Sequence, residues 1–216
     1  MNVYTVIGIW GVISGILCAQ ADVPLAWSGR RGDPVDAKAV GRITSWWTEV
    51  SEKRFDLAFC LSCIGQPGTY LTMWMLSELI SSPVLSLCLK INTFISAYTG
   101  LLFHAAACIK PMVYRKIAGQ VSDETAQEVM NAIDRYPAVP SIVSAICLLL
   151  GTTVIMVTAI LTGALAVSKV FVLFNPVGAL LFQWIQRRLN LKIGGAMGIG
   201  FSLYAIILIA AGMGMH

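Results

Sequence analysis

The chain of 216 residues is 57% hydrophobic and only 12% charged, with a mean hydropathy of +0.76. Because a water-soluble domain carries about 25% charged residues, this composition excludes an ordinary soluble domain and indicates an integral membrane protein. The net charge of +4 comes from short basic runs between apolar segments rather than from one patch, so nucleic acid is not expected as a partner.

The first apolar segment, Val3 to Leu25, is too long for the core of a signal peptide and has no basic region before it. It predicts a membrane span, since about 20 apolar residues suffice to cross a bilayer. The polar connection that follows contains Asp33-Pro34-Val35-Asp36. Asp33 can cap a helix there and Pro34 suits its first position.

A surface helix is therefore expected over Val35–Lys53. Its apolar residues recur at spacings of three and four, namely Val40, Ile43, Trp47 and Val50. This pattern is typical of a helix that lies along the membrane surface. Trp46 and Trp47 suit the headgroup zone of the bilayer.

Two long apolar segments predict the second and third spans. The second covers Asp56–Leu79 and is interrupted by Gln66-Pro67-Gly68, where the proline removes a backbone hydrogen bond and predicts a kink. The third covers Pro83–Tyr114 and carries His104 deep inside it. An ionisable group at that depth is costly unless it faces protein or water, so His104 is expected to face the interior of the bundle.

The second half of the chain predicts three further spans. Ser122-Asp123-Glu124 begins a short surface helix, and Tyr136-Pro137 ends it. Spans four to six are predicted over Ala138–Ala164, over Val170–Ile185 with Asn175-Pro176 inside it, and from Ile193 to the C-terminus. The predicted fold is all-α, a single domain over residues 1–216. It is a polytopic bundle of six transmembrane helices with short amphipathic interfacial helices on the cytoplasmic side.

The basic residues predict the orientation of this bundle. All of the 15 Lys and Arg residues except Lys90 and Lys169 lie in the first, third and fifth connections. Positively charged connections resist translocation. We therefore expect a multi-pass protein of the cell membrane, with these three connections in the cytoplasm and both termini outside.

Glycines predict how the last span packs. Gly194 and Gly198 form a GxxxG step in the glycine-rich segment that ends the chain. Such a step lets two helix backbones approach closely. Packing within the chain is the first interpretation, and a homodimer seam through the last span is the alternative.

Several short motifs resemble an uncharacterised family of small bacterial six-span membrane proteins, classed as a domain of unknown function. The residues that carry the resemblance are Gly15 to Asp22, Pro24-Leu25, Arg54, Gly65 to Tyr70, Gly100, Phe103-His104-Ala105 and Phe174-Asn175-Pro176. Ser168-Lys169 departs from the pattern at the entrance to the fifth span. The resemblance implies the six-span fold and brings no activity with it.

Five polar residues inside or beside the spans are the candidates for a binding site. Asp22, Arg54 and His104 belong to the cytoplasmic leaflet, and Gln66 and Asn175 lie nearer the midplane. Together they could line a cavity open to the cytoplasm. The function that this favours is binding or moving a small amphipathic or lipid-like ligand.

Two other interpretations remain open. An intramembrane enzyme could use Asp22, Arg54 and His104, although the chain contains no familiar catalytic signature. In a structural protein without a ligand, Asp22 would pair with Arg54 or interfacial water, His104 would donate to a backbone carbonyl, and the amides would bind backbone freed by the prolines.

A metal site is a further, weaker hypothesis. The residues Cys60, Cys63, His104 and Cys108 have the types and spacings that a zinc site needs across an antiparallel helix pair. Cysteine is also common as a small buried apolar residue, and Cys18, Cys88 and Cys147 lie inside other predicted spans. We therefore expect no metal and no cofactor.

The predicted topology can be tested by cysteine accessibility. In a background without other reactive cysteines, Gly32→Cys and Gly119→Cys should escape an impermeant thiol reagent in intact cells, because both positions lie in cytoplasmic connections. Both should react once the cells are permeabilised. Labelling of the two positions in intact cells would contradict the orientation.

Overall fold

In a computed structural model of the protein, the described residues are 2–26, 45–189, 191 and 194–214, and they form helices with no β-strand among them. In chain order these elements are α1 (Val3–Ala26), η2 (Ser45–Thr48), α2 (Lys53–Leu79), α3 (Pro83–Ile117), α4 (Asp123–Ala145), η3 (Ile146–Gly151), α5 (Thr152–Leu161), η4 (Lys169–Leu173), α6 (Pro176–Arg188) and α7 (Ala196–Gly212). The segments η2 and η4 are 3₁₀-helices, and η3 is a π-helix.

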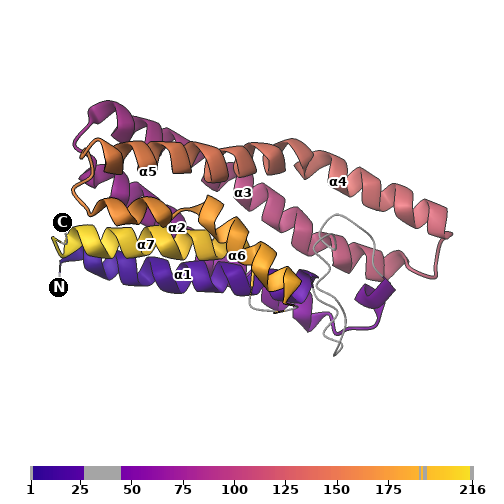
Figure 1. The fold of residues 1–216 in the computed structure, drawn as a ribbon. Helices are drawn as coiled ribbons and strands as arrows, with labels where there is room; N and C mark the ends of the chain where they lie inside the picture. The colour runs from indigo at the N-terminus through magenta and orange to yellow at the C-terminus, as the bar shows by residue number, and fades with distance from the viewer. Residues whose placement is uncertain (1, 27–44, 190, 192–193, 215–216) are drawn as a thin grey trace.

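The helices form two groups (Figure 1). In the first group α1 packs against both α2 and α7, and in the second α3 packs along α4; α2 packs against α3 where the two groups meet. Both ends of the chain lie at the same end of the molecule. There the Asn2 side-chain amide donates to the carbonyl of Gly212, which joins the start of α1 to the end of α7.

Glycines allow α1 to approach its two neighbours closely. A Cβ added at Gly65 of α2 would lie 2.8 Å from the Ser14 carbonyl oxygen, and one added at Gly198 of α7 would lie 2.7 Å from the Ala19 Cα. No ordinary side chain fits such spaces. The predicted GxxxG step therefore lies against α1 of the same chain, as its first interpretation expected.

Sequence signals placed most helix starts well. The expected spans over Val3–Leu25, Asp56–Leu79 and Pro83–Tyr114 correspond to α1, α2 and α3. The helix predicted to begin at Ser122-Asp123-Glu124 does begin there, and Ser122 caps it, because its hydroxyl accepts a hydrogen bond of 3.2 Å from the Thr125 backbone N–H.

The predicted end of a surface helix at Tyr136-Pro137 is wrong. The helix that begins at Asp123 continues through Pro137 and Pro140 into η3 and α5, and ends at Leu161. A proline removes only one backbone hydrogen bond and disfavours a helix without forbidding it. Packing of α4 along α3, with Ala126 and Met130 buried, outweighs that loss.

Residues 35–44 of the predicted surface helix Val35–Lys53 lie outside the described residues. For the remainder, the prediction of an α-helix is wrong. From Ser45 the chain forms only a 3₁₀ turn, and Arg115 of α3 holds it by donating to the carbonyls of Trp47, at 2.6 Å, and Val50. Trp47 is 1% exposed and packs edge-to-face on Tyr114, so the protein interior buries it.

The predicted fifth span is interrupted rather than continuous. A 3₁₀-helix, Lys169–Leu173, precedes Asn175, and α6 begins at Pro176. By length and composition, three helices among the described residues could cross a membrane: Val3–Leu25, Pro83–Ile117 and Asp123–Leu161. The helix α7 contains a shorter apolar stretch, Gly198–Gly212.

A buried ion pair fastens the α3–α4 hairpin. The Lys110 side chain is 2% exposed, and its ammonium donates to the carboxylate of Asp134, whose side chain is 39% exposed. Taking an ammonium out of water is costly unless a carboxylate faces it. Asp134 therefore fixes how α4 lies along α3.

This role of Asp134 can be measured through the stability of the protein in detergent. Asp134→Asn should lower the free energy of unfolding by about 2 kcal/mol, between the values for exposed and buried pairs, because the buried Lys110 side chain loses its carboxylate partner. Adding Lys110→Met should restore much of this loss. The control is Glu128→Gln, an exposed position of α4. Equal melting temperatures for Asp134→Asn and Glu128→Gln would contradict the role.

Candidate functional site

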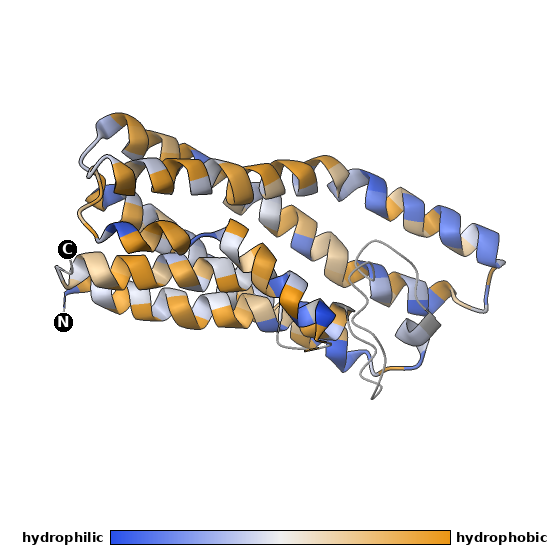
Figure 2. Ribbon diagram, in the orientation of Figure 1, coloured by the Kyte–Doolittle hydropathy of each residue, from blue (hydrophilic) through white to orange (hydrophobic). Residues whose placement is uncertain are grey.

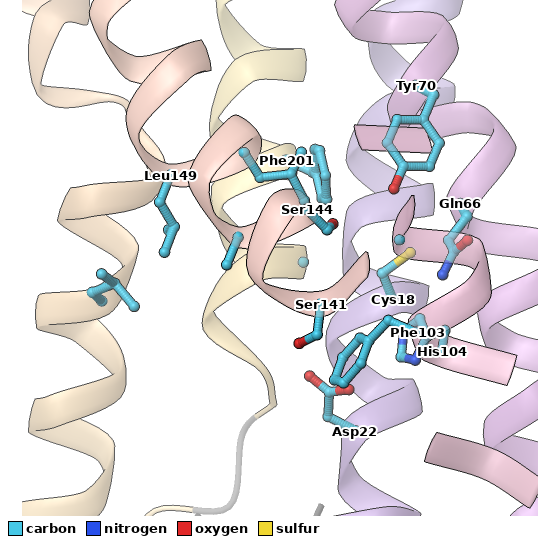
Figure 3. A pocket seen from close by; sticks show the side chains of 15 residues that line it. Cys18, Asp22, Gln66, Tyr70, Phe103, His104, Ser141, Ser144, Leu149 and Phe201 are labelled. Atoms are coloured by element: carbon cyan, nitrogen blue, oxygen red, sulfur yellow. The ribbon is translucent and has the colours of Figure 1, made fainter. Parts of the chain in front are cut away.

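A partly open pocket of about 340 Å³ lies between the two groups of helices (Figure 3). Its walls come from α1, α2, α3, α4, η3, α6 and α7. This volume falls at the lower end of the range of about 300–1,000 Å³ that ligand pockets occupy. The pocket suits a single chain or a small ring better than a lipid with two acyl chains.

Asp22 supplies the formal charge at one end of the pocket. It lies on α1 one helical turn after Cys18, which also lines the pocket. The Asp22 carboxylate occupies the space that a Cβ on Gly195 would need, so the start of α7 lies directly against it. No hydrogen bond or ion pair joins this carboxylate to any residue in the described part of the chain.

Gln66 and His104 face the same end from α2 and α3. Gln66 is 8% exposed, and both its Oε1 and the Nδ1 of His104 are buried without a hydrogen-bond partner among the described residues. His104 lies near enough to Asp22 for the two to interact electrostatically. Buried polar atoms usually have partners. In this pocket two such atoms, on adjacent helices, lie in the same lining as the Asp22 carboxylate.

Apolar side chains form the remainder of the lining. They are Phe103, Ala145, Leu148, Leu149, Leu180 and Phe201. Figure 3 shows Asp22, His104 and Ser141 toward one end and Phe201 and Leu149 toward the other. The pocket is therefore amphipathic along its length.

The π-helix η3 shapes the apolar wall. Asn92 of α3 donates to the Cys147 carbonyl at 3.0 Å and to the Thr152 hydroxyl at 2.8 Å, and Thr152 donates to the same carbonyl at 3.0 Å. Gly151 leaves the room that the Asn92 side chain needs. Because a π-turn adds a residue to a helix, it shifts the face that the following residues present. Leu148 and Leu149 of this turn line the pocket.

Two residues predicted for the site lie elsewhere. Arg54 does not line the pocket, and its guanidinium donates to the carbonyls of Pro24 at 2.8 Å and Val23 at 3.3 Å, at the end of α1. Asn175 caps α6, since it accepts from the Gly178 N–H at 3.1 Å and donates to the Val172 carbonyl at 2.8 Å. The structure thus brings Asp22, Gln66 and His104 together and leaves Arg54 and Asn175 outside.

The lining also contains residues that the sequence analysis missed. Ser141, Ser144, Ala145 and Leu148 follow one another at spacings of three, one and three. They share one helical face. Small polar residues on one face of an apolar helix are the sequence signal that could have identified this face as part of a site. Tyr70 was missed too, and its hydroxyl donates to the Ser96 carbonyl at 3.2 Å beside Gly100.

The hypothetical metal ligands do not gather. Cys60 and Cys63 are exposed on α2, whereas Cys108 is buried. In the part of the chain that the structure describes, no three His, Cys, Asp or Glu side chains lie close enough to hold a metal ion. The four predicted ligands Cys60, Cys63, His104 and Cys108 therefore form no site.

Comparison with known proteins gives one family. The model of a family described as "Family of unknown function (DUF6796)" matches residues 1–215. No curated protein and no solved structure is significantly similar to the chain.

The dependence of the pocket wall on Asn92 can be tested by mutation. Asn92→Leu should destabilise the protein by about 1–3 kcal/mol, because the buried Thr152 hydroxyl and the Cys147 carbonyl lose a donor. Thermal unfolding in detergent measures the loss. Asn131→Leu is the control, since Asn131 accepts its hydrogen bond from Gln127 on the exposed face of α4. If the two variants unfold at the same temperature, the proposed role of Asn92 is wrong.

Proposed function

The chain belongs to the DUF6796 family, whose function is unknown, and we propose that it is an integral membrane protein that binds or moves a small amphipathic or lipid-like ligand. The ligand would occupy the pocket that contains Asp22, Gln66 and His104.

The outer surface of the bundle supports a membrane location. Large apolar side chains are exposed on several helices, for example Phe94 at 70%, Leu181 at 61% and Leu150 at 59%. Apolar surface of this extent is costly in water and suits contact with lipid. We propose six spans, formed by α1, α2, α3, the continuous helix α4–η3–α5, the interrupted pair η4–α6, and α7.

The distribution of polar residues supports the proposed orientation in the cell membrane. Figure 2 shows hydrophilic residues gathered at the end of the molecule opposite the two termini, where α4 begins and α6 ends. The basic first, third and fifth connections belong to that end in the proposed topology. The termini would then lie outside, and the Asp22 end of the pocket would face the cytoplasm.

The amphipathic lining of the pocket is the observation that carries the proposed function. One end offers the Asp22 carboxylate and the unpartnered Gln66 Oε1 and His104 Nδ1, and the rest offers mainly aliphatic and aromatic surface. Unpartnered buried polar atoms destabilise a protein. A ligand with a polar head and an apolar tail would satisfy both parts at once.

An intramembrane enzyme is the second candidate, favoured by the position of Asp22 near His104 in one pocket. A carboxylate and an imidazole in one pocket can share the work of general acid–base catalysis, although no hydrogen bond joins Asp22 to His104 in this structure. Arg54 would have no part in it, because its guanidinium binds carbonyls at the end of α1. Mass spectrometry of the ligand released from the protein would distinguish an enzyme, which changes the mass of the ligand, from a binding protein, which does not.

Native mass spectrometry of protein extracted in mild detergent tests the proposed function. The wild type should carry an amphiphile of single-chain size, or bind one that is added. Ala145→Phe places a large side chain in the pocket and should lower occupancy by about tenfold or more, the effect expected of overpacking. His104→Leu should also lower occupancy without loss of folding.

The control places the same large side chain on the outside of the bundle. Val154 of α5 is 62% exposed, and Val154→Phe should leave occupancy unchanged. If the wild type binds no amphiphile, or if Ala145→Phe binds as well as the wild type, the proposed function is wrong.

A further inference from the structure

We propose that the ligand of this pocket is a single-chain amphiphile whose headgroup is a protonated primary amine, bound by Asp22, Gln66 and His104. This inference rests on the proposed function and specifies the class of ligand.

The charge of the lining is the first argument. Asp22 is the acidic residue of the pocket, and no Lys or Arg is found among the lining residues that the structure describes. A phosphate or carboxylate headgroup would lie beside the Asp22 carboxylate without a cation to offset their repulsion, which is strong in apolar surroundings. A cationic headgroup would instead be attracted.

The nearest described basic groups are engaged elsewhere. Arg54 donates to backbone carbonyls at the end of α1 and lies over the ring of Trp46, with 5.2 Å from its guanidinium carbon to the ring centroid. Lys110 is paired with Asp134. The Asp22 carboxylate therefore has no Lys or Arg partner among the described side chains, although it lies inside the bundle.

The pattern of donors and acceptors is the second argument. The carboxylate of Asp22 accepts hydrogen bonds only, the unpartnered atom of Gln66 is its carbonyl oxygen Oε1, and the Nδ1 of His104 can accept when the ring is neutral. Asp22, Gln66 and His104 come from three helices and line one pocket, where Gln66 adds an amide N–H₂ donor to these acceptors (Figure 3). A primary ammonium brings three N–H donors and no acceptor, so its hydrogen bonding matches this end.

The rest of the pocket accommodates the tail. Phe103 stacks against His104, with ring centroids 6.2 Å apart, and brings an apolar ring to the Asp22 end of the pocket (Figure 3). Leu148, Leu180 and Phe201 then offer apolar contact. A volume of about 340 Å³ limits the tail to one chain.

The test compares four dodecyl compounds, namely dodecylamine, dodecyltrimethylammonium, dodecanol and dodecanoate. Equilibrium binding of the radiolabelled compounds is measured on the full chain in nanodiscs, with binding to empty nanodiscs subtracted. Dodecylamine should bind about tenfold or more tightly than dodecanol, because its ammonium makes a charge-assisted hydrogen bond with Asp22. Dodecylamine should also bind about tenfold or more tightly than dodecyltrimethylammonium, because that cation has no N–H donor. Dodecanoate should bind most weakly of the four.

Variants assign the preference to named residues. Asp22→Asn should reduce the preference for dodecylamine over dodecanol to about threefold or less, while dodecanol still binds. Gln66→Leu should weaken dodecylamine specifically. Asp56→Asn changes an exposed carboxylate in the first turn of α2 and should keep the wild-type preference.

The outcomes separate the two proposals. If dodecanol binds but dodecylamine binds no better, the amine inference fails and the pocket remains an amphiphile site. An undiminished amine preference in Asp22→Asn also overturns the inference. If none of the four compounds binds above the empty nanodiscs, the proposed function itself fails.

Discussion

The close approach of α1 to α2 and α7 is the constraint on which the pocket depends. Gly65 and Gly198 have no side chain, so the backbone of α1 passes between its neighbours almost in contact with both. The same turn of α1 carries Cys18 and Asp22. A larger side chain at either glycine would displace α1 and move the Asp22 carboxylate away from the polar end of the pocket.

Several polar side chains elsewhere in the bundle are satisfied within their own helix. On α2 the hydroxyls of Ser62, Thr69 and Thr72 donate to carbonyls three or four residues earlier in the same helix. Ser96 of α3 does the same. Such local bonds satisfy polar groups without a partner helix, and they explain how α2 can be buried although its polar residues lower its hydropathy. Gln66, on the same helix, has an oxygen without such a bond.

The sequence predicted the first three long helices and the convergence of Asp22, Gln66 and His104, because hydrophobic length and the cost of a buried ionisable group are local signals. It did not predict that the helix continues past Pro137, since that depends on packing along α3. It also placed Arg54 and Asn175 in the site, because a single sequence does not show whether a polar group binds a ligand or a backbone carbonyl. Both residues bind backbone groups.

The pocket lies in the seam between two helix groups that are each held together by other means. Glycine contacts join α1 to α2 and α7, whereas the Lys110–Asp134 pair joins α3 to α4. Few direct bonds cross the seam near the pocket, and the Tyr70 hydroxyl bonded to the Ser96 carbonyl is one of them. A ligand seated there would touch both groups, so its binding energy would add to the contacts that hold them together.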